Sequence, residues 1–443
     1  MKEFIRITFV VVLLILIIDI FVIKNQNFTE DQTHSSLTER AEQSVQDEVS
    51  LGIEDITVFE AEEVTEFEAE EVEPEELTLS RVAILEEAEY MFKGYFYEEA
   101  LELLNSNELL INDETRELEA RIIEEKDNLV LFEGQVKHIF FHSLILDPEY
   151  LFPDLSIPTG GYNEGFVFQT EFQRMLPLIL ERGYVLYNIN DIFSVGEDGQ
   201  MEQREIWLPP GRRPLILSID DPTYHYGIGF ANRLFVDENG ELKSEVVTPD
   251  GEIITNDGDI QLILNDFVRE HPEFSWRGHK GIIAATGFMG IFGYDLHTED
   301  SRVEATRVAE ALKETGWIFA NHSYTHNHGV PSWWSQDADL DNIRLDVRLW
   351  KEEIEPIVGQ TNILIAPGGV VLPPHAMSVI LESGYNIYCS VNPSQSVTIF
   401  PDYVLQERIE IGGFSLIHWS DYLTEHFFDV KRVIDSHRPP TLS

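Results

Sequence analysis

Short apolar runs alternate with amphipathic segments over residues 129–443, and this alternation constrains the fold more than any other feature of the chain. The strand-like runs are VKHIFFHSLI, YVLYNI, PLILSID, GIIAATG, WIFANH, NILIAP, NIYCSV and FSLIHW. Helical patterns lie between several of them, among them EFQRMLPLILERG, SRVEATRVAEALKETG, DNIRLDVRLWKEEIEPIVG and PHAMSVILESG. Strands that alternate with helices form a parallel sheet, and about seven such units close into a barrel. The sequence therefore predicts an α/β fold, a (β/α) barrel of about seven strands.

Two adjacent carboxylates, Asp220 and Asp221, follow the apolar run that begins at Pro214. Pro222 ends the predicted strand because proline cannot continue a hydrogen-bonded ladder. Neighbouring side chains of a strand point to opposite faces, but at a strand end the pleat fades and both acids can serve one cavity. One acid is then suited to bind a cation and the other to accept a proton. Asp-Asp-Pro is also an ordinary turn, which is the alternative interpretation.

A pair of histidines, His322 and His326, follows another apolar run that begins at Trp317. Side chains four residues apart meet on one face of a helix turn. With Asp221 they would form a set of two imidazoles and one carboxylate, which binds zinc and leaves positions open for water and substrate. Such a metal lowers the pKa of its bound water, and Asp220 would take the proton. The alternative is a helix N-cap built on the neighbouring capping residues Asn321, Ser323 and Thr325.

The candidate residues all lie at or just past the ends of predicted strands. Besides the two acids and the two histidines, these are the segment Pro367–Gly369 and His418. In barrels of this kind, the chemistry sits beyond the C-terminal ends of the strands. The placement therefore favours one common site.

These motifs resemble the polysaccharide deacetylase (NodB-homology) family, carbohydrate esterase family four. The family's first motif, Thr-Phe-Asp-Asp-Gly, is similar to Ser218–Pro222, and its second, His-Ser/Thr-x-x-His, matches His322–His326. The resemblance spans about residues 136–419. It implies a distorted (β/α) barrel of about seven strands and a divalent metal, usually zinc. It also implies hydrolysis of an N-acetyl, less often an O-acetyl, group on a glycan.

The resemblance also implies a role for each matching residue. Asp220 would be the catalytic base, and Asp221, His322 and His326 the metal ligands. In the family a histidine near the last strand is the general acid, and the matching residue is His418.

Three departures from the family pattern concern the supporting residues. The third motif, Arg-x-Pro-Tyr/Phe-Gly, is Ile365–Gly369 here and lacks the arginine that orients the base. The fourth, Asp-x-x-Asp-Trp, has no counterpart near Cys389–Asn392, so no acid is evident to tune His418. Pro222 replaces a glycine and removes its N–H, although an oxyanion donor at Thr223 would survive.

Several residues near the motifs are predicted to contact substrate. Exposed aromatic rings stack well on sugar faces, and the alternative for these rings is a place in the core. The predicted substrate-binding residues are Tyr224, Trp333, Trp334, Pro367 and Gly368. Three further histidines are interpreted as structural residues or substrate contacts rather than metal ligands: His142, His225 and His328.

The N-terminal residues 1–24 predict a transmembrane anchor. Lys2 and Arg6 precede an apolar run that extends from Ile7 to Ile23 with one interruption, Asp19. This length is close to that needed to span the hydrocarbon core, and the positive charges favour a cytoplasmic N-terminus with the remainder exported. The expected location is the cell membrane, with the barrel extracytoplasmic. A cleaved signal peptide is the alternative, but no small-x-small site follows.

Residues 25–76 predict an acidic, disordered linker, because like charges repel and bury little surface. Eighteen acidic residues and one basic residue, Arg40, lie between Glu30 and Glu76, and FEAEEV occurs twice. Calcium collection is the alternative.

Residues 77–128 have a helical period, and AEYMFKGYFYEEALELL resembles one tetratricopeptide unit. A single unit is expected to pack on the next domain or on another chain.

Composition excludes several functions. The formal charge of −50 argues against nucleic acid as a partner, because phosphate binding needs clustered Lys and Arg. The single cysteine, Cys389, excludes an intrachain disulfide and a cysteine-based metal site. DENGEL, TPDGEI and NDGD predict β-hairpins inserted after the strand that carries Asp220; Asp237–Leu242 does not match a calcium loop.

The sequence thus predicts a membrane-anchored, metal-dependent deacetylase whose substrate is a polysaccharide such as peptidoglycan, a chitin-like polymer or poly-N-acetylglucosamine. One rival is a carbohydrate-binding pseudoenzyme on the same barrel, suggested by the missing motifs. Another is a scaffold whose helical segment and linker recruit cell-surface partners.

Overall fold

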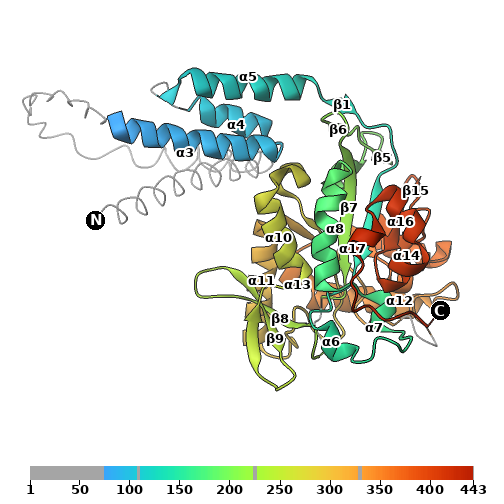
Figure 1. Ribbon diagram of the computed structural model, residues 1–443. Coiled ribbons are helices and arrows are strands. Elements are labelled where there is room, and N and C mark those ends of the chain that lie inside the picture. Colours follow the sequence, from blue (N-terminus) through green and yellow to red (C-terminus); the bar gives the residue numbers. More distant parts are fainter. Residues whose placement is uncertain (1–73, 107–109, 223–226, 328–331, 443) are drawn as a thin grey trace, which may run out of the picture. The chain divides into compact units, whose positions relative to one another are not determined.

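The computed structural model describes residues 74–106, 110–222, 227–327 and 332–442 (Figure 1). Seven parallel strands close into a ring in the order β7-β11-β12-β13-β14-β16-β2 and back to β7. These strands are β2 (Lys137–Phe141), β7 (Arg213–Asp220), β11 (Gly281–Ala285), β12 (Trp317–Asn321), β13 (Ile363–Ile365), β14 (Ile387–Val391) and β16 (Val404–Glu410). The predicted barrel of about seven strands is therefore confirmed.

The ring is closed unevenly, which distorts the barrel. β2 and β7 pair over five residues, but β16 and β2 pair only at Ile409–Ile139 and Glu410–Phe140. β12 and β13 pair at a single position, Asn321–Leu364. An additional strand, β3 (Tyr184–Leu186), pairs with the N-terminal half of β7, whereas β11 pairs with its C-terminal half. At both junctions the remaining pairs involve the last residues of a strand, Asn321 of β12 and Ile409 and Glu410 of β16.

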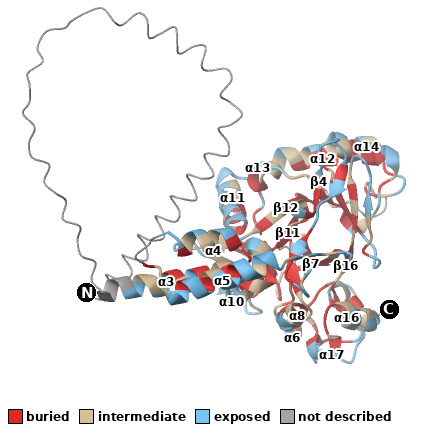
Figure 2. Ribbon diagram, turned by 90° about the horizontal axis from the view of Figure 1, so that it is seen from above, coloured by how far each residue is buried: buried red, intermediate tan, exposed pale blue. Residues whose placement is uncertain are grey.

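Helices cover the outside of the barrel, as the buried strands require. A parallel strand that is buried on both faces has a continuous apolar sequence, and every residue of β11 is buried. In Figure 2 the strands at the centre are buried, and the helices around them alternate buried and exposed residues. These helices are α8 (Gln169–Glu181), α10 (Ile260–Glu270), α11 (Glu299–Glu314), α12 (Leu340–Glu353), α13 (Glu355–Val358) and α14 (Pro374–Glu382).

The end of the barrel differs from the prediction. FSLIHW is not a strand but the helix α15 (Gly413–His418), whose start is capped by Ser415 Oγ accepting the Gly412 N–H at 3.0 Å. The last barrel strand is β16, VLQERIE, which the apolar pattern missed because Gln406 and Arg408 are polar yet fully buried. Two helices follow, α16 (Ser420–His426) and α17 (Val430–Val433).

The predicted hairpins after the strand that carries Asp220 are confirmed. β8 (Ala231–Val236), β9 (Leu242–Val247) and β10 (Ile253–Asn256) form a three-stranded antiparallel sheet. Asp237 Oδ1 closes the first turn by accepting the N–H groups of Asn239 and Glu241 at 2.8 and 2.9 Å. The remaining short elements are β1 (Val130–Leu131), α6 (Pro148–Leu151), α7 (Tyr162–Gly165), α9 (Ile189–Ile192), β4 (Phe193–Val195), β5 (Met201–Gln203), β6 (Trp207–Leu208), β15 (Val397–Ile399) and the 3-10 turns η2 (Pro272–Phe274), η3 (Trp276–Gly278) and η4 (Pro367–Gly369).

Three helices precede the barrel in the chain. They are α3 (Pro74–Lys93), α4 (Tyr97–Leu104) and α5 (Asp113–Asp127). Asn112 caps α5 by accepting the Thr115 N–H at 2.9 Å. The Tyr95 ring, between α3 and α4, stacks on Trp276 of η3 with ring centres 4.8 Å apart. The helical segment therefore packs on the barrel, one of the two arrangements expected from its sequence.

The predicted anchor, residues 1–24, lies outside the described residues, and so does the predicted linker as far as residue 73. Helix α3 begins at Pro74, just inside the range expected for the linker. Within the described part of the chain, every helix is too short or too polar to cross a bilayer.

Candidate metal centre and substrate cavity

Three of the predicted ligands come together at the C-terminal ends of β7 and β12. Asp221 Oδ1 lies 3.8 Å from His322 Nε2, and Asp221 Oδ2 lies 3.3 Å from His326 Nε2. One ligand atom from each of the three residues falls within 4.8 Å of the others. Both strands pair with β11, so their C-terminal ends lie close together on one rim of the barrel.

The two histidines lie on a loop and not on a helix turn, so the helix-turn and N-cap interpretations are both wrong. Ser323 and His326 have positive φ values of 63° and 49°, which no helix accommodates. Asn321 Oδ1 accepts the Ser323 N–H at 2.7 Å, and Ser323 Oγ accepts the His326 N–H at 2.8 Å. These short-range bonds turn the chain back after β12 and bring both rings to Asp221.

A buried carboxylate on α12 fixes this loop from outside the barrel. Asp346 is fully buried and accepts the N–H groups of Tyr324 and Thr325 at 2.7 and 3.1 Å, and also the Thr325 hydroxyl. A buried carboxylate with several donors is costly to displace. The loop is therefore pinned between the two histidines.

The chemistry of the three donors fits a divalent metal. His322 Nδ1 lies 2.8 Å from the Ile365 carbonyl, which can only accept, so the ring proton is on Nδ1 and the Nε2 lone pair faces the carboxylates. Thr286 Oγ1 donates to Asp221 Oδ1 at 2.6 Å. Burial would raise the pKa of Asp221, but the neighbouring histidines outweigh it and hold this pKa below its ordinary value. Two imidazoles and one carboxylate suit zinc in particular.

The second carboxylate, Asp220, is held by an arginine that the sequence did not reveal. Arg408, on β16, donates from Nη1 to Asp220 Oδ1 at 2.8 Å and from Nη2 to Oδ2 at 3.0 Å. Both side chains are buried, with 0% and 5% of their surfaces exposed. Burial would raise the pKa of Asp220, but Arg408, followed by His322, holds this pKa well below its usual range. Asp220 is therefore an oriented, ionised carboxylate 3.9 Å from His322.

The guanidinium of Arg408 is itself fixed from two sides. Nη1 also donates to Ser218 Oγ at 3.0 Å, and the Arg408 carbon Cζ lies 4.1 Å from the centre of the Phe140 ring. The arginine of the third motif is absent at Ile365–Gly369, as the sequence indicated, and the guanidinium that contacts Asp220 comes from β16.

A cavity of about 990 Å³ opens onto the metal ligands. Its lining residues are His142, Gly160, Gly161, Tyr162, Phe166, Asp221, Thr286, Phe288, Met289, Thr325, His326 and Asn327. The aromatic and thioether side chains are partly accessible, with Phe288, Met289 and Tyr162 exposed by 64%, 46% and 41%. An accessible apolar lining next to a polar centre is typical of a ligand site.

His142 is a histidine of this cavity that lies outside the ligand set. Its Nδ1 lies 3.3 Å from Glu410 Oε1 at the end of β16. Burial lowers the pKa of His142, but Glu410 and the two aspartates more than compensate and raise it to about 9. An imidazole that carries a proton thus faces the same space as the ligands.

Other predicted site residues are not among those that line this cavity. His418 lies on α15, where its Nε2 is 2.7 Å from Thr441 Oγ1, and its role as general acid stays a prediction. Trp334 is 2% exposed and belongs to a hydrophobic core with Ile343 and Val347, which corrects the expectation of a stacking ring. Trp333 is partly buried against the same core, and Pro367 and Gly368 form η4 after β13. Tyr224, His225, Thr223 and His328 lie outside the described residues.

The sequence also left out the cavity's apolar wall. Tyr162 and Phe166 come from the segment after the first strand, and Phe288 and Met289 from the loop after GIIAATG. A signal was available for the second pair, because that loop follows a predicted barrel strand at the end where chemistry is expected.

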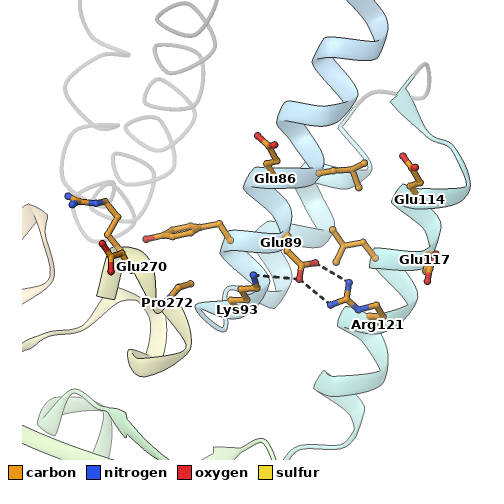
Figure 3. A pocket seen from close by; sticks show the side chains of 12 residues that line it. Glu86, Glu89, Lys93, Glu114, Glu117, Arg121, Glu270 and Pro272 are labelled. Atoms are coloured by element: carbon orange, nitrogen blue, oxygen red, sulfur yellow. Dashed lines mark hydrogen bonds and ion pairs between the residues drawn. The ribbon is translucent and has the colours of Figure 1, made fainter. Parts of the chain in front are cut away.

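A second cavity, of about 620 Å³, lies between α3, α5 and α10 (Figure 3). Glu89 is one of its lining residues and pairs with Arg121 at 3.0 Å and with Lys93 at 4.0 Å. Its lining has no histidine and no cysteine, so it lacks the donors of the first cavity.

Comparison with known proteins gave structural neighbours. No family model matches the sequence, and no curated protein matches it. One solved structure with a similar arrangement is the deacetylase PplD of Streptococcus pyogenes in complex with acetate, with 12% identity and a TM-score of 0.38 over 64% of this chain and 97% of that one. Another is a de-N-acetylase of Aggregatibacter actinomycetemcomitans, with 12% identity and a TM-score of 0.38 over 63% of this chain and 96% of that one. Both neighbours are deacetylases by name.

Proposed function

We propose that this protein is a metal-dependent deacetylase that hydrolyses N-acetyl, or O-acetyl, groups of a cell-wall or extracellular polysaccharide. One observation supports the proposal above the others. The ligand set Asp221, His322 and His326 lies beside an ionised carboxylate, Asp220, that Arg408 clamps with two hydrogen bonds. Ligands alone would serve a binding protein equally well, whereas an oriented base next to them serves hydrolysis.

Each residue has a distinct task in this proposal. Asp221, His322 and His326 would hold the metal, which supplies polarisation of a carbonyl oxygen and a lowered pKa for water. Asp220 accepts the proton of the attacking water, and Arg408 keeps its carboxylate ionised and aimed at the site. Because the guanidinium occupies both oxygens on one side, the carboxylate has a fixed orientation before substrate arrives.

We assign the proton donor for the leaving nitrogen to His142. It lines the same cavity as Asp221 and His326, and Glu410 lies 3.3 Å from its Nδ1. A carboxylate next to an imidazole favours its protonated form, which can give a proton to a leaving group. The leaving amine of an amide needs that proton, whereas an activated ester does not.

The cavity supports the proposed substrate class, and the N-terminal sequence supports the proposed location of the protein. The cavity is open and partly aromatic, which suits a sugar ring of a polymer such as peptidoglycan, a chitin-like glycan or poly-N-acetylglucosamine. Residues 1–24 would anchor the protein in the cell membrane with the barrel outside the cytoplasm. Zinc is the proposed metal.

Acetate release from N-acetylglucosamine oligomers, peptidoglycan and poly-N-acetylglucosamine tests the proposal. The zinc-loaded protein is expected to release acetate from at least one of them, to lose this activity with a chelator and to regain it with zinc. His322→Ala is expected to lose both bound metal, measured by mass spectrometry, and acetate release, because one of three donors is gone. His375→Ala on the exposed face of α14 is the matched control and is expected to change neither.

Two negative results separate the alternatives. Bound metal without acetate from any of the glycans would favour the carbohydrate-binding pseudoenzyme. A wild-type protein that binds no divalent metal would refute the site.

Replacement of His142 with asparagine is expected to lower kcat on the oligomer by roughly 100-fold, the lower end for a positioned proton donor. The same variant is expected to hydrolyse 4-nitrophenyl acetate at nearly the wild-type rate, because nitrophenolate leaves without a proton. His418→Ala is the comparison, and it is expected to keep both activities. If His418→Ala shows the selective loss instead, the general acid is His418, as the family resemblance implies.

A further inference from the structure

One segment supplies a third of the cavity lining. We call residues 159–168 the wall segment; it contributes Gly160, Gly161, Tyr162 and Phe166. The rings of Tyr162 and Phe166 meet edge to face with centres 5.3 Å apart, and the Phe166 ring lies 5.1 Å from that of His142. The position of this segment therefore sets both an aromatic surface and the environment of His142.

The chain after α17 holds the wall segment in place. In this tail, residues 435–442, Arg438 Nη1 donates to the Asn163 carbonyl at 2.7 Å and to Asn163 Oδ1 at 3.0 Å. Its Nη2 donates to the Phe166 carbonyl at 3.0 Å. Asn163 Nδ2 donates back to the Pro439 and Pro440 carbonyls at 3.1 and 3.3 Å. The two segments thus share one network that runs in both directions.

The arginine of this network is locked to the barrel. Arg438 and Glu171, on α8, form an ion pair in which 1% and 0% of the side-chain surfaces are exposed. Arg438 Nε donates to Glu171 Oε1 at 2.8 Å, and Glu171 also accepts the Phe168 and Asp435 N–H groups at 2.8 and 3.0 Å. A buried pair whose hydrogen-bonding groups are this well satisfied has little freedom to move.

The hydrogen-bond network is also tightly packed against α15. A Cβ built on Gly413, at the start of α15, would lie 1.9 Å from the Asn163 carbonyl oxygen and 2.1 Å from Arg438 Nη1. The start of α15 therefore packs directly on Asn163 and Arg438, and the network lies between α15 and α8.

We propose that Arg438 and Asn163 are positioning residues that fix Tyr162, supported by Phe166, as the surface on which a sugar ring of the substrate stacks. The inference rests on the proposed function for the nature of the substrate. Asn163 and Arg438 are buried and are not among the residues that line the cavity, whereas Tyr162 lines it and is 41% exposed. Affinity for glycan is then set in part by residues that do not touch it.

The test compares Asn163→Ala with its parent, because this variant removes the side-chain bonds between Asn163 and the tail and leaves the Arg438–Glu171 pair intact. The dissociation constant for the N-acetylglucosamine pentamer is measured by calorimetry in an Asp220→Asn background, so that substrate is not consumed. It is expected to rise about tenfold, since a displaced binding surface loses affinity without losing any contact group. Backbone amides of residues 159–168 are expected to exchange with deuterium faster.

Two further variants sharpen the comparison. Arg438→Lys keeps the positive charge beside Glu171 but loses the planar guanidinium that donates to several acceptors at once. Its dissociation constant for the pentamer is therefore expected to lie between those of the parent and Asn163→Ala. Asn362→Ala is the control, because Asn362 makes a similar side-chain bond, to Asn386 at 2.9 Å, at the start of β13. It is expected to leave both the affinity and the exchange of residues 159–168 unchanged.

The outcomes are separable from those of the proposed function. Faster exchange with unchanged affinity, or unchanged exchange in Asn163→Ala, would overturn the inference, as would a parent that does not bind the pentamer. A wild-type protein that binds the pentamer and releases no acetate would defeat the deacetylase proposal, and the dissociation constants would still decide the role of Asn163.

Discussion

Replacement of Asp220 with asparagine is expected to lower kcat for acetate release on the order of 10³-fold while bound zinc stays at the wild-type level. The amide has the size of the carboxylate and keeps one acceptor for Arg408, but it cannot take a proton from water. Asp220 is also absent from the ligand set, which consists of Asp221 and the two histidines. Initial rates with the N-acetylglucosamine pentamer, together with metal content by mass spectrometry, measure the two effects separately.

The control for this substitution is Asp191→Asn. Asp191 is an exposed acid on α9, outside the residues that line the cavity, and the same change there is expected to leave kcat within about twofold of wild type. If Asp220→Asn loses its metal, Asp220 is a ligand and the base must be sought elsewhere. If it keeps both metal and activity, the assignment of the base is wrong.

Arg408→Met is expected to have a double effect. Removal of one partner of a buried ion pair costs about 3–5 kcal/mol of unfolding free energy, because the remaining charge has no compensation. The Asp220 carboxylate also loses its orientation, and a misplaced catalytic group costs about 10²-fold in kcat. Urea denaturation and the acetate assay, both on purified protein, check the two predictions.

Two companion variants show which property of Arg408 matters. Arg408→Lys keeps the charge but not the paired hydrogen bonds, so an activity between those of wild type and Arg408→Met is expected. Arg213→Met, at the exposed start of β7, removes an arginine from a strand that shares the barrel and is expected to cost less than about 1 kcal/mol. Wild-type kinetics in Arg408→Met would show that the pair serves stability alone.

Much of the fold was predictable because it depends on local sequence patterns, such as apolar runs and turn residues. Six of the seven barrel strands follow from apolar runs spaced by helical segments, all except β16, and the hairpins β8–β10 follow from their Asn-Gly and Asp-Gly turns. The metal-ligand set followed from residues that stand at strand ends, since parallel strands bring their C-terminal ends to one rim. The loop that carries His322 and His326 did not follow, because its two positive φ values depend on Asn321 and Asp346 rather than on local helix signals.

Arg408 shows why the rest of the site escaped prediction. An arginine in VLQERIE has the appearance of a surface residue on an edge strand, since buried charges are rare unless paired. Its partner, Asp220, lies 188 residues earlier in the chain. The pattern along one strand cannot show which strand will face it across the barrel. His142 and Glu410 form a similar pair, joined only by the closure of β16 on β2.

That closure has a consequence for how the protein folds. β16 and β2 meet through only two residue pairs, and they bring together the beginning and the end of the barrel sequence. Contacts between residues so far apart in the chain have the largest entropic cost of loop closure, and we expect them to form late in folding. Arg408 reaches past β2 to Asp220 on β7 and so spans this same junction. The ion pair that completes the base is therefore expected to form at the last step of folding, so that a chain truncated before residue 404 would lack both its barrel closure and its oriented carboxylate.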